Sequence, residues 1–524
     1  MFKKNILIFT LSISAIAGCG GGSNTGQSPA TIDERETPPT ITELEVTEGG
    51  IDGQTLSVNI VCDECLPSLH VYRWSIDGTI ISTTDRYELS FQDYNKEIRI
   101  DVSANNNASL SDSSYKVIVP SRVQVTEIYS TSEAFAALKT DGTIVTWGDG
   151  RYGGRSESVD LTGVTKVYSS TYSFIALKAD DVVVTWGHDN STFEISEVTE
   201  IYSNLEAFAA LKADGTVVTW GRDVYGGDSS YVELSDVVEI YSTAFAFAAL
   251  KNDDTVVTWG LDSSGGDSNS VDLTNVAEIY SAREVFAALK KDGTAETWGN
   301  VNAGADSSSV ELDNITNIYA AQNAFVATKS DDSISTWGND WANNFDDFTL
   351  TNIVDIYPTS FAFAALTIDG SVRTWGHNLW ITGHNNPEIN NISEIYTSRG
   401  AFAGLKSDGS VVTWGNRIFG SVSSGVELSN VRKIFSTREA FAALKMDGTV
   451  ATWGSNTSGG DSSSVELSNV IDIYSTDSAF AALKSDGSVI TWGYSLSSYE
   501  ISDIADRLLP SEVDILTIET DLNP

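Results

Sequence analysis

The sequence predicts an all-β protein whose largest part is a β-propeller built from ten short repeats of about 39 residues, preceded by a small β-sandwich. Three observations predict this class. A Trp-Gly pair recurs ten times, short apolar runs rich in aromatic and β-branched residues precede each pair, and an upstream region alternates apolar and polar residues. Self-similarity at such a period is typical of solenoids and propellers.

The repeats share one order of sequence blocks. In the commonest form, from Ile201 to Gly221, an Ile-Tyr-Ser block is followed by Ala-Phe-Ala-Ala-Leu-Lys, then Asp-Gly, then Thr-Val-Val-Thr-Trp-Gly. The apolar blocks predict three strands per repeat, and the Ser-Val-Glu-Leu segments that follow predict a short fourth. We expect the repeated Phe and Trp side chains to form the core. The tryptophans of the pairs are Trp147, Trp186, Trp220, Trp259, Trp298, Trp337, Trp375, Trp414, Trp453 and Trp492.

A tight hairpin turn is predicted between the second and third strands of each repeat. Seven repeats carry Asp-Gly there, and glycine accepts the positive φ that such turns require. The other three repeats carry Asp-Asp, beginning at Asp180, Asp253 and Asp331. We expect slight strain in those three turns.

The two ends of the array predict a closed ring. The first repeat lacks the Gly-Gly-Asp-Ser-Ser-Ser-Val-Glu-Leu segment that precedes most of the others, and residues 498–502 after the last Trp-Gly resemble part of it. A C-terminal strand that completes the first blade would hide the sheet edges. A ring of seven blades with extra repeats and an open superhelix remain alternatives.

The pattern Ala-Leu-Lys-x-Asp-Gly-x-Val-x-Thr-Trp-Gly, followed in one repeat by Tyr225-Gly226-Gly227-Asp228, resembles the regulator of chromosome condensation repeat family. The resemblance covers residues 121–505 and implies propeller blades. The repeats are shorter than those of the eukaryotic namesake and are similar to the compact blades of β-lactamase inhibitory protein II. Because the match lies in blade-building positions only, it carries over no functional residue.

The N-terminus predicts export and lipidation. Residues 1–18 combine Lys3 and Lys4 with a short apolar run, as a signal peptide does, and Ile16-Ala17-Gly18-Cys19 resembles the lipobox of bacterial lipoproteins. That resemblance implies a lipid on Cys19; an ordinary cleaved signal is the alternative. Residues 19–39 read as a flexible tether. Because Gly20 stands where inner-membrane lipoproteins carry Asp, we expect an outer-membrane anchor facing either side.

Residues 40–120 predict an antiparallel sandwich that resembles bacterial immunoglobulin-like modules, with Trp74 in its core. Cys62 and Cys65 are the two cysteines beyond Cys19, and an oxidising compartment favours a disulfide between them. Free thiols and a metal or redox site remain alternatives. Residues 506–524 read as a C-terminal tail, and no later segment is apolar enough to predict a membrane span.

Composition excludes some functions. Lys and Arg number 31 and Asp and Glu number 72, which gives a formal charge of −41. Such a chain repels nucleic-acid backbones. The sequence contains no HExxH, GxSxG or phosphate-binding loop, so we expect no enzyme activity, no cofactor and no metal. A hydrolase with paired carboxylates and weak calcium binding by acidic loops remain open.

Two sets of candidate binding residues stand out where the repeats differ. The loops after Trp337, Trp375 and Trp414 diverge from the common form, and their aromatic side chains predict one exposed patch for protein hot spots or sugar stacking. The alternative is that these side chains fill a gap left by a missing loop. The candidates in these loops are Trp341, Phe345, Trp380, His384 and Phe419.

The second set lies three residues after the repeated Tyr or Phe. This position varies between fixed neighbours, which predicts a solvent-facing turn, and its three arginines are candidates for contacting an acidic partner. The residues are Ser132, Thr171, Leu205, Ala244, Arg283, Gln322, Ser360, Arg399, Arg438 and Asp477.

These features predict a lipid-anchored, noncatalytic binding scaffold at the cell envelope, with a protein or polysaccharide as partner. A hydrolase of envelope polysaccharide or peptide and an inhibitor of a secreted enzyme are the alternatives. We expect no nucleic-acid partner and, because the chain is exported, no GTPase partner.

Overall fold

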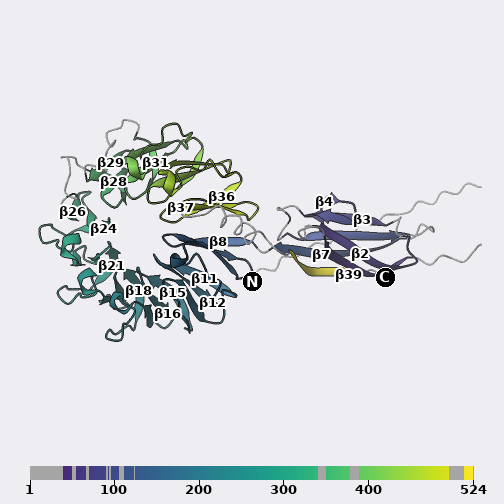
Figure 1. The fold of residues 1–524 in the computed structure, drawn as a ribbon, viewed down its shortest axis with the longest axis horizontal. Coiled ribbons are helices and arrows are strands. Elements are labelled where there is room, and N and C mark those ends of the chain that lie inside the picture. The colour runs from purple at the N-terminus through teal and green to yellow at the C-terminus, as the bar shows by residue number, and fades with distance from the viewer. Residues whose placement is uncertain are drawn as a thin grey trace, which may run out of the picture.

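The computed structural model describes residues 39–49, 55–66, 70–89, 93, 96–105, 111–122, 124–339, 341, 350–377, 389–494 and 513–522. These residues form a ring of ten small antiparallel sheets and, beside it, a two-sheet sandwich (Figure 1). The predicted all-β propeller is therefore confirmed. Within the described ranges, no helix has the length and apolarity needed to span a membrane.

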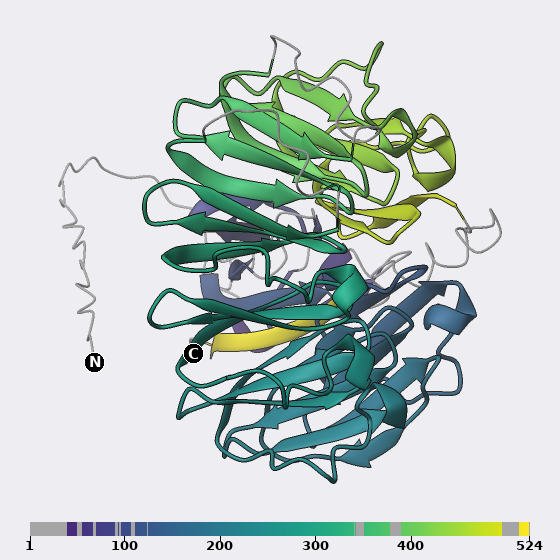
Figure 2. The same ribbon diagram turned by 90° about the vertical axis from the view of Figure 1, so that its left-hand side faces the viewer.

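Each sheet of the ring is one blade, and the blades are numbered 1 to 10 along the chain. Figure 2 shows them side by side as separate small sheets. The first strands of neighbouring blades contact one another along the inside of the ring. These first strands are β8 (Val125–Ser130), β11 (Val164–Ser169), β15 (Val198–Ser203), β18 (Val237–Ser242), β21 (Val276–Ser281), β24 (Ile315–Ala320), β27 (Ile353–Pro358), β30 (Ile392–Thr397), β33 (Val431–Ser436) and β36 (Val470–Ser475).

The second strand of each blade lies between the first and the third. The second strands are β9 (Ala134–Lys139), β12 (Ser173–Lys178), β16 (Ala207–Lys212), β19 (Ala246–Lys251), β22 (Val285–Lys290), β25 (Ala324–Lys329), β28 (Ala362–Thr367), β31 (Ala401–Lys406), β34 (Ala440–Lys445) and β37 (Ala479–Lys484). The third strands are β10 (Ile144–Gly148), β13 (Val182–Gly187), β17 (Val217–Gly221), β20 (Val256–Gly260), β23 (Ala295–Gly299), β26 (Ile334–Gly338), β29 (Val372–Gly376), β32 (Val411–Gly415), β35 (Val450–Gly454) and β38 (Val489–Gly493).

The core of the ring is a stack of Phe and Trp rings between adjacent blades. In blade 4, Phe247 and Trp259 lie opposite each other on neighbouring strands, and their rings stack with centroids 5.1 Å apart. Both side chains are fully buried against Ala207 and Ala209 of blade 3. Small alanines let the next sheet approach closely enough for the aromatic pair to fill the remaining space.

The repeated Trp and Gly residues also connect successive blades. The indole nitrogen of Trp259 donates a hydrogen bond to the carbonyl of Gly226 in the previous blade, at 3.1 Å. Gly226 has a φ of +102°, and a Cβ there would lie 2.8 Å from the Phe247 ring. Only glycine fits this close approach, which explains the Gly-Gly pair in the loop.

The hairpin turns between second and third strands follow the sequence-based expectation. Gly215 has a φ of +79°, and Asp181, Asp254 and Asp332 replace glycine in the three Asp-Asp turns with φ between +64° and +66°. The preceding aspartate closes each turn. Asp214 Oδ1 accepts hydrogen bonds from the Thr216 backbone N–H at 3.0 Å and the Thr216 hydroxyl at 2.6 Å.

The predicted fourth strand forms in blade 2, where β14 (Thr192–Glu194) pairs with β13. In blade 4 the same segment makes one ladder-like bond, from Val256 N–H to the Leu273 carbonyl at 3.2 Å. Among the described residues, six blades carry a single 3-10 turn after Trp-Gly. These turns are η3 (Gly150–Tyr152), η4 (Asp223–Tyr225), η5 (Asp262–Ser264), η6 (Val301–Ala303), η8 (Arg417–Phe419) and η9 (Asn456–Ser458).

Blade 10 packs directly on blade 1 and closes the ring. Ala479, Ala481 and Leu483 of blade 10 share one buried cluster with blade 1, and the Ser130 hydroxyl donates to the Ser475 carbonyl at 2.8 Å. The described strands of blade 1, β8 to β10, all come from its own repeat. Closure thus comes from packing of the first blade on the last, and residues 498–502 lie outside the described residues.

The sandwich consists of two sheets. One contains β1 (Thr40–Gly49), β2 (Thr55–Asp63) and β5 (Arg86–Glu88), and the other contains β4 (Thr79–Ser82), β3 (Val71–Ile76), β6 (Ile98–Asn105), β7 (Ser111–Arg122) and β39 (Val513–Leu522). Trp74 is fully buried between them, as expected from the sequence. Its indole nitrogen donates to the Thr84 carbonyl at 2.9 Å.

Strand β39 comes from the segment that the sequence indicated as a C-terminal tail. It pairs antiparallel with β7, from Val513 opposite Arg122 to Leu522 opposite Ser114, and it is the yellow strand beside β7 in Figure 1. The sandwich therefore contains strands from the segment before the ring and a strand from the segment after it. The tail assignment is wrong for residues 513–522.

Candidate functional site

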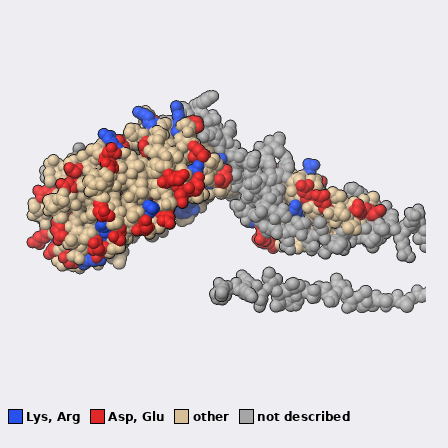
Figure 3. Space-filling view, turned by 90° about the horizontal axis from the view of Figure 1, so that it is seen from below, with Lys and Arg blue, Asp and Glu red and all other residues tan. Residues whose placement is uncertain are grey.

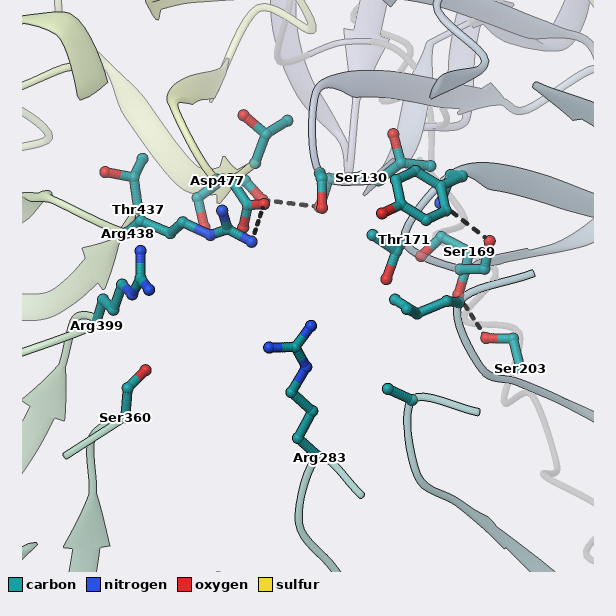
Figure 4. A pocket seen from close by; sticks show the side chains of 18 of the residues that line it. Ser130, Ser169, Thr171, Ser203, Arg283, Ser360, Arg399, Thr437, Arg438 and Asp477 are labelled. Carbon is teal, nitrogen blue, oxygen red and sulfur yellow. Dashed lines mark hydrogen bonds and ion pairs between the residues drawn. The ribbon is translucent and has the colours of Figure 1, made fainter. Parts of the chain in front are cut away.

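A cavity of about 1000 Å³ lies on the axis of the ring. The turns between the first and second strands of all ten blades line it, and Figure 4 shows it from close by. The lining is rich in hydroxyl groups, because each first strand ends in Ser, Thr or a similar small residue at this point. Tyr172 is its one aromatic side chain among the described residues.

Most of these turns are held by the side chain that follows the first strand; in blades 5 and 6 that residue is Ala282 or Ala321, whose side chain forms no hydrogen bond. In blade 4, the Thr243 hydroxyl donates to the Ser264 carbonyl in η5 at 3.0 Å and accepts from the Ala246 N–H at 3.0 Å. Asn204 and Ser398 bond in the same way to Tyr225 and Phe419. The turn is thereby fixed to the 3-10 turn of its own blade.

The next residue in each turn belongs to a circle of backbone hydrogen bonds around the cavity. The N–H of Arg283, for example, donates to the Gln322 carbonyl at 3.3 Å, and the N–H of Asp477 in blade 10 donates to Ser132 in blade 1 at 2.9 Å. Eight such bonds are present among the described residues. We call these positions the hoop residues: Ser132, Thr171, Leu205, Ala244, Arg283, Gln322, Ser360, Arg399, Arg438 and Asp477.

The hoop residues are the variable position singled out in the sequence, and every one of them lines the cavity. Because the hoop is held by backbone groups, its side chains are under little constraint to maintain the fold. The sequence period predicted a turn in each blade. The structure brings the ten turns together around one space.

The arginines of the hoop all lie between blades 5 and 9. Figure 4 shows Arg283, Arg399 and Arg438 extending toward the same open space. Arg438 Nη2 lies 2.9 Å from Asp477 Oδ2, whereas Arg283 Nε lies 4.0 Å from Glu284 Oε1. Arg399 is exposed, and its guanidinium lies 5.9 Å from the Phe419 ring centroid.

The first strands carry the opposite charge a short distance away. Seven repeats have Glu or Asp two residues before the repeated Tyr, for example Glu239 before Tyr241. Since a strand rises about 3.3 Å per residue, roughly 10 Å separate Glu239 from Ser242 at the cavity. These carboxylates are not among the residues predicted from the sequence, although their fixed spacing from the Tyr is visible there.

These carboxylates interact with the tyrosines on the same strands. The Tyr241 hydroxyl donates to Glu239 at 2.8 Å. Burial, reinforced by the bonded carboxylate, raises the pKa of Tyr241. Burial and the charge of Asp355, on the first strand of the next blade, raise the pKa of Tyr319 to about 12. The tyrosines therefore remain protonated at neutral pH and act as hydrogen-bond donors.

At the seam between blades 1 and 10, the Ser478 hydroxyl donates to Glu133 Oε2 at 2.5 Å. Burial raises the pKa of Glu133, and the Ser478 hydrogen bond partly opposes this shift. Among the described residues that line the cavity, Asp477 is the one carboxylate. The described lining thus offers no carboxylate pair for general acid and base catalysis.

The predicted exposed aromatic patch is wrong for the two candidates that the structure describes. Trp341 and Phe419 are only 9% and 8% exposed. Trp341 packs on Phe361 and Phe363 at centroid distances of 6.2 and 5.9 Å, so it fills space beside the core of the next blade. Phe345, Trp380 and His384 lie outside the described residues.

The sandwich contains the two cysteine candidates. Cys62 and Cys65 are joined as a disulfide, with their Cα atoms 5.8 Å apart. A His70 ring nitrogen and the two sulfur atoms lie within 4.8 Å of one another, and burial lowers the pKa of His70. Cys19 lies outside the described residues.

No family model and no curated protein sequence matches the chain. Several solved structures are similar at low identity. Prp20p from Saccharomyces cerevisiae is 14% identical, with 73% of this chain and 85% of that chain covered and a TM-score of 0.28. The ectodomain of the Arabidopsis thaliana receptor kinase ACR4 is 14% identical, with 59% and 100% covered and a TM-score of 0.31. The computationally designed Ika8 protein is 14% identical, with 71% and 96% covered and a TM-score of 0.30. Because these TM-scores are low, the fold assignment rests on the topology of the ring itself.

Proposed function

We propose that the protein is a noncatalytic binding scaffold at the cell envelope that holds a protein partner at the hoop. The observation that carries this proposal is the concentration of sequence variation. The blades repeat nearly the same residues at their structural positions, yet the hoop position carries seven different residue types. All ten of these side chains line one cavity.

The fixed backbone and polar side chains of the hoop favour binding. Its backbone is held by hydrogen bonds from blade to blade, so little conformational entropy is lost when a partner docks. Polar side chains in the turns, such as Gln322 and Ser360, and charged ones, such as Arg399, supply directional contacts. A rigid ring that presents variable turns on one face is a common arrangement for recognition.

The sequence supports the envelope part of the proposal. Residues 1–18 have the features of an export signal, and Cys19 follows the small residues of a lipobox. We propose that a lipid on Cys19 anchors the protein to the outer membrane and that the sandwich acts as a spacer. Replacement of Cys19 by Ser is expected to abolish incorporation of a labelled fatty acid and to release the protein from the membrane fraction; retention of both would contradict lipidation.

Site-specific photocrosslinking in the producing cell tests the binding proposal. A photoreactive phenylalanine derivative replaces Ser360 in the hoop of the full chain. The matched control replaces Met446, which is 70% exposed in the hairpin turn at the other end of the strands of blade 9. We expect a covalent adduct with one protein from Ser360 and none from Met446. Adducts from both positions, or from neither, would overturn the proposal.

A further inference from the structure

We propose that the partner presents an acidic peptide segment and that Arg283 and Arg399 bind its carboxylates at the hoop. This inference rests on the proposed function and adds the chemistry of the ligand. It comes from the placement of the three hoop arginines in a protein whose formal charge is −41.

The charge at the hoop differs from that of the surrounding surface. Figure 3 shows acidic side chains spread over the side of the ring that faces the viewer. The described lining of the cavity, in contrast, contains three arginines and one aspartate. Arginines gathered at one opening of a protein with a large negative charge attract an acidic segment toward the cavity.

A depression of about 400 Å³ lies between Arg283 and Arg399. Gln322 and Ser360 lie between these arginines along the hoop, and Pro358 adds an apolar surface. The volume is in the range that accommodates a small ligand or a few residues of a peptide. An acidic side chain needs this combination, because its carboxylate requires donors while its methylene groups pack on apolar atoms.

Arg283 and Arg399 differ from Arg438 in whether a carboxylate already pairs closely with the guanidinium. Arg438 already contacts Asp477 at 2.9 Å. Among the described residues, Arg283 has only the longer contact of 4.0 Å to Glu284 Oε1 and its side chain is half exposed, and Arg399 has no ion pair. A guanidinium offers two parallel N–H donors to a carboxylate. These two groups are therefore the ones that a carboxylate ligand would engage.

The lining favours a peptide over an acidic polysaccharide. Sugar rings are commonly bound over exposed aromatic faces, and the described lining offers Tyr172 alone, in blade 2, away from the arginines of blades 5 and 8. The candidate aromatic residues Trp341 and Phe419 are buried. Farther along the first strands, Glu239 and its equivalents repel an acidic chain, so we expect it to bind at the hoop without threading through the ring.

Fluorescence anisotropy with the full chain tests this inference. The probes are labelled hexaglutamate and hexaglutamine peptides, and the test variant is Arg283→Gln/Arg399→Gln. The control variant, Arg373→Gln/Arg417→Gln, makes the same change in charge at two exposed arginines outside the cavity lining. We expect binding of hexaglutamate only, weakened roughly tenfold or more by the test variant and about twofold or less by the control.

Two additions keep the result interpretable. The Arg283→Lys/Arg399→Lys variant retains the charge but not the planar donor pair, so its affinity should lie between those of the native protein and the Gln variant. Thermal unfolding should be unchanged in all variants because the arginines are exposed. Displacement of hexaglutamate by excess salt is expected for a contact of this kind.

Three outcomes would overturn the inference: no hexaglutamate binding by the native protein, equal weakening by both Gln variants, or preferential binding of an oligogalacturonate, which would indicate a polysaccharide ligand. The Ser360 photocrosslink separates these failures from failure of the scaffold proposal. If the adduct persists while the arginine variant has no effect, the hoop binds a partner through other chemistry. If the adduct is absent, the proposed function itself fails.

Discussion

Two turns of the same blade are held in different ways. In the hairpin turn between the second and third strands, the side chain of an aspartate closes the turn, as Asp214 does by accepting two hydrogen bonds from Thr216. The hoop turn between the first and second strands is held by a side chain such as that of Thr243 and also by backbone bonds to the neighbouring blade, as from Arg399 to Arg438 at 3.1 Å. The aspartate that closes the hairpin turn is the same in all ten repeats, while the hoop residue, which contributes only its backbone to the circle of bonds, is able to vary.

The largest contrast is expected between the blade core and the hoop. Trp259→Ala removes a fully buried side chain and should lower the free energy of unfolding by about 3–5 kcal/mol. Arg399→Gln changes an exposed side chain and should shift it by less than about 0.5 kcal/mol. Urea unfolding followed by tryptophan fluorescence and circular dichroism measures both. Similar losses would show that hoop side chains support the fold.

Acid should weaken the hairpin turns collectively. Hydrogen bonds from the Thr367 and Ser371 hydroxyls lower the pKa of the exposed Asp369 to about 2 from an ordinary 3.8, and the pKa values of the equivalent Asp292 and Asp408 are lowered likewise. Since the folded pKa is the lower one, this stabilisation is present above pH 3.8 and is lost as the pH falls toward 2.

Unfolding free energies at a series of pH values check this expectation. The Asp369→Asn variant should show a smaller loss between pH 4 and 2 than the native protein, because it has one fewer carboxylate to protonate there. The control is the Asp477→Asn variant, which removes one carboxylate at the hoop and leaves the hairpin turns unchanged. An Asp369→Asn curve parallel to the native one would contradict the role of the carboxylate.

Within blade 7, the two turns offer a matched pair of alanine substitutions. Gly370 in the hairpin turn has a φ of +76°, and a Cβ there would lie 3.0 Å from the Asn391 Cα. Gly370→Ala should cost about 1–2 kcal/mol, whereas Ser360→Ala at the hoop should cost less than about 0.5 kcal/mol. The thermal unfolding temperatures of the two variants, each compared with that of the native protein, distinguish these costs. A larger shift for Ser360→Ala would reverse the comparison.

The smallest effect is expected from an Asp-Asp hairpin turn. Asp332 is exposed and has a φ of +66°, a conformation that glycine adopts without a Cβ penalty. Asp332→Gly should therefore raise stability, by less than about 1 kcal/mol because glycine also loses more entropy on folding. A small rise in Tm is the expected readout, and a fall would show that the Asp332 side chain makes a stabilising contact.

The sequence was sufficient to predict the repeats, their three strands and the Phe and Trp core, because each blade is determined by local periodicity. It also predicted the hoop position from its variability. It did not predict that Arg283, Arg399 and Arg438 face one cavity, since that depends on how ten turns meet around an axis. Buried Trp341 and Phe419 were misjudged because an aromatic residue in an irregular loop has the same sequence signature whether exposed or packed.

Strand β39 was not predicted because nothing in its alternating residues specifies a partner on the far side of the ring. Its pairing has a mechanical consequence. Arg122 at the end of β7 lies opposite Val513 at the start of β39, so both connections to the ring leave the sandwich at the same end. A force that pulls the ring away from the sandwich would therefore act on β7 and β39 together. Extracting either strand would require breaking its hydrogen bonds to the other.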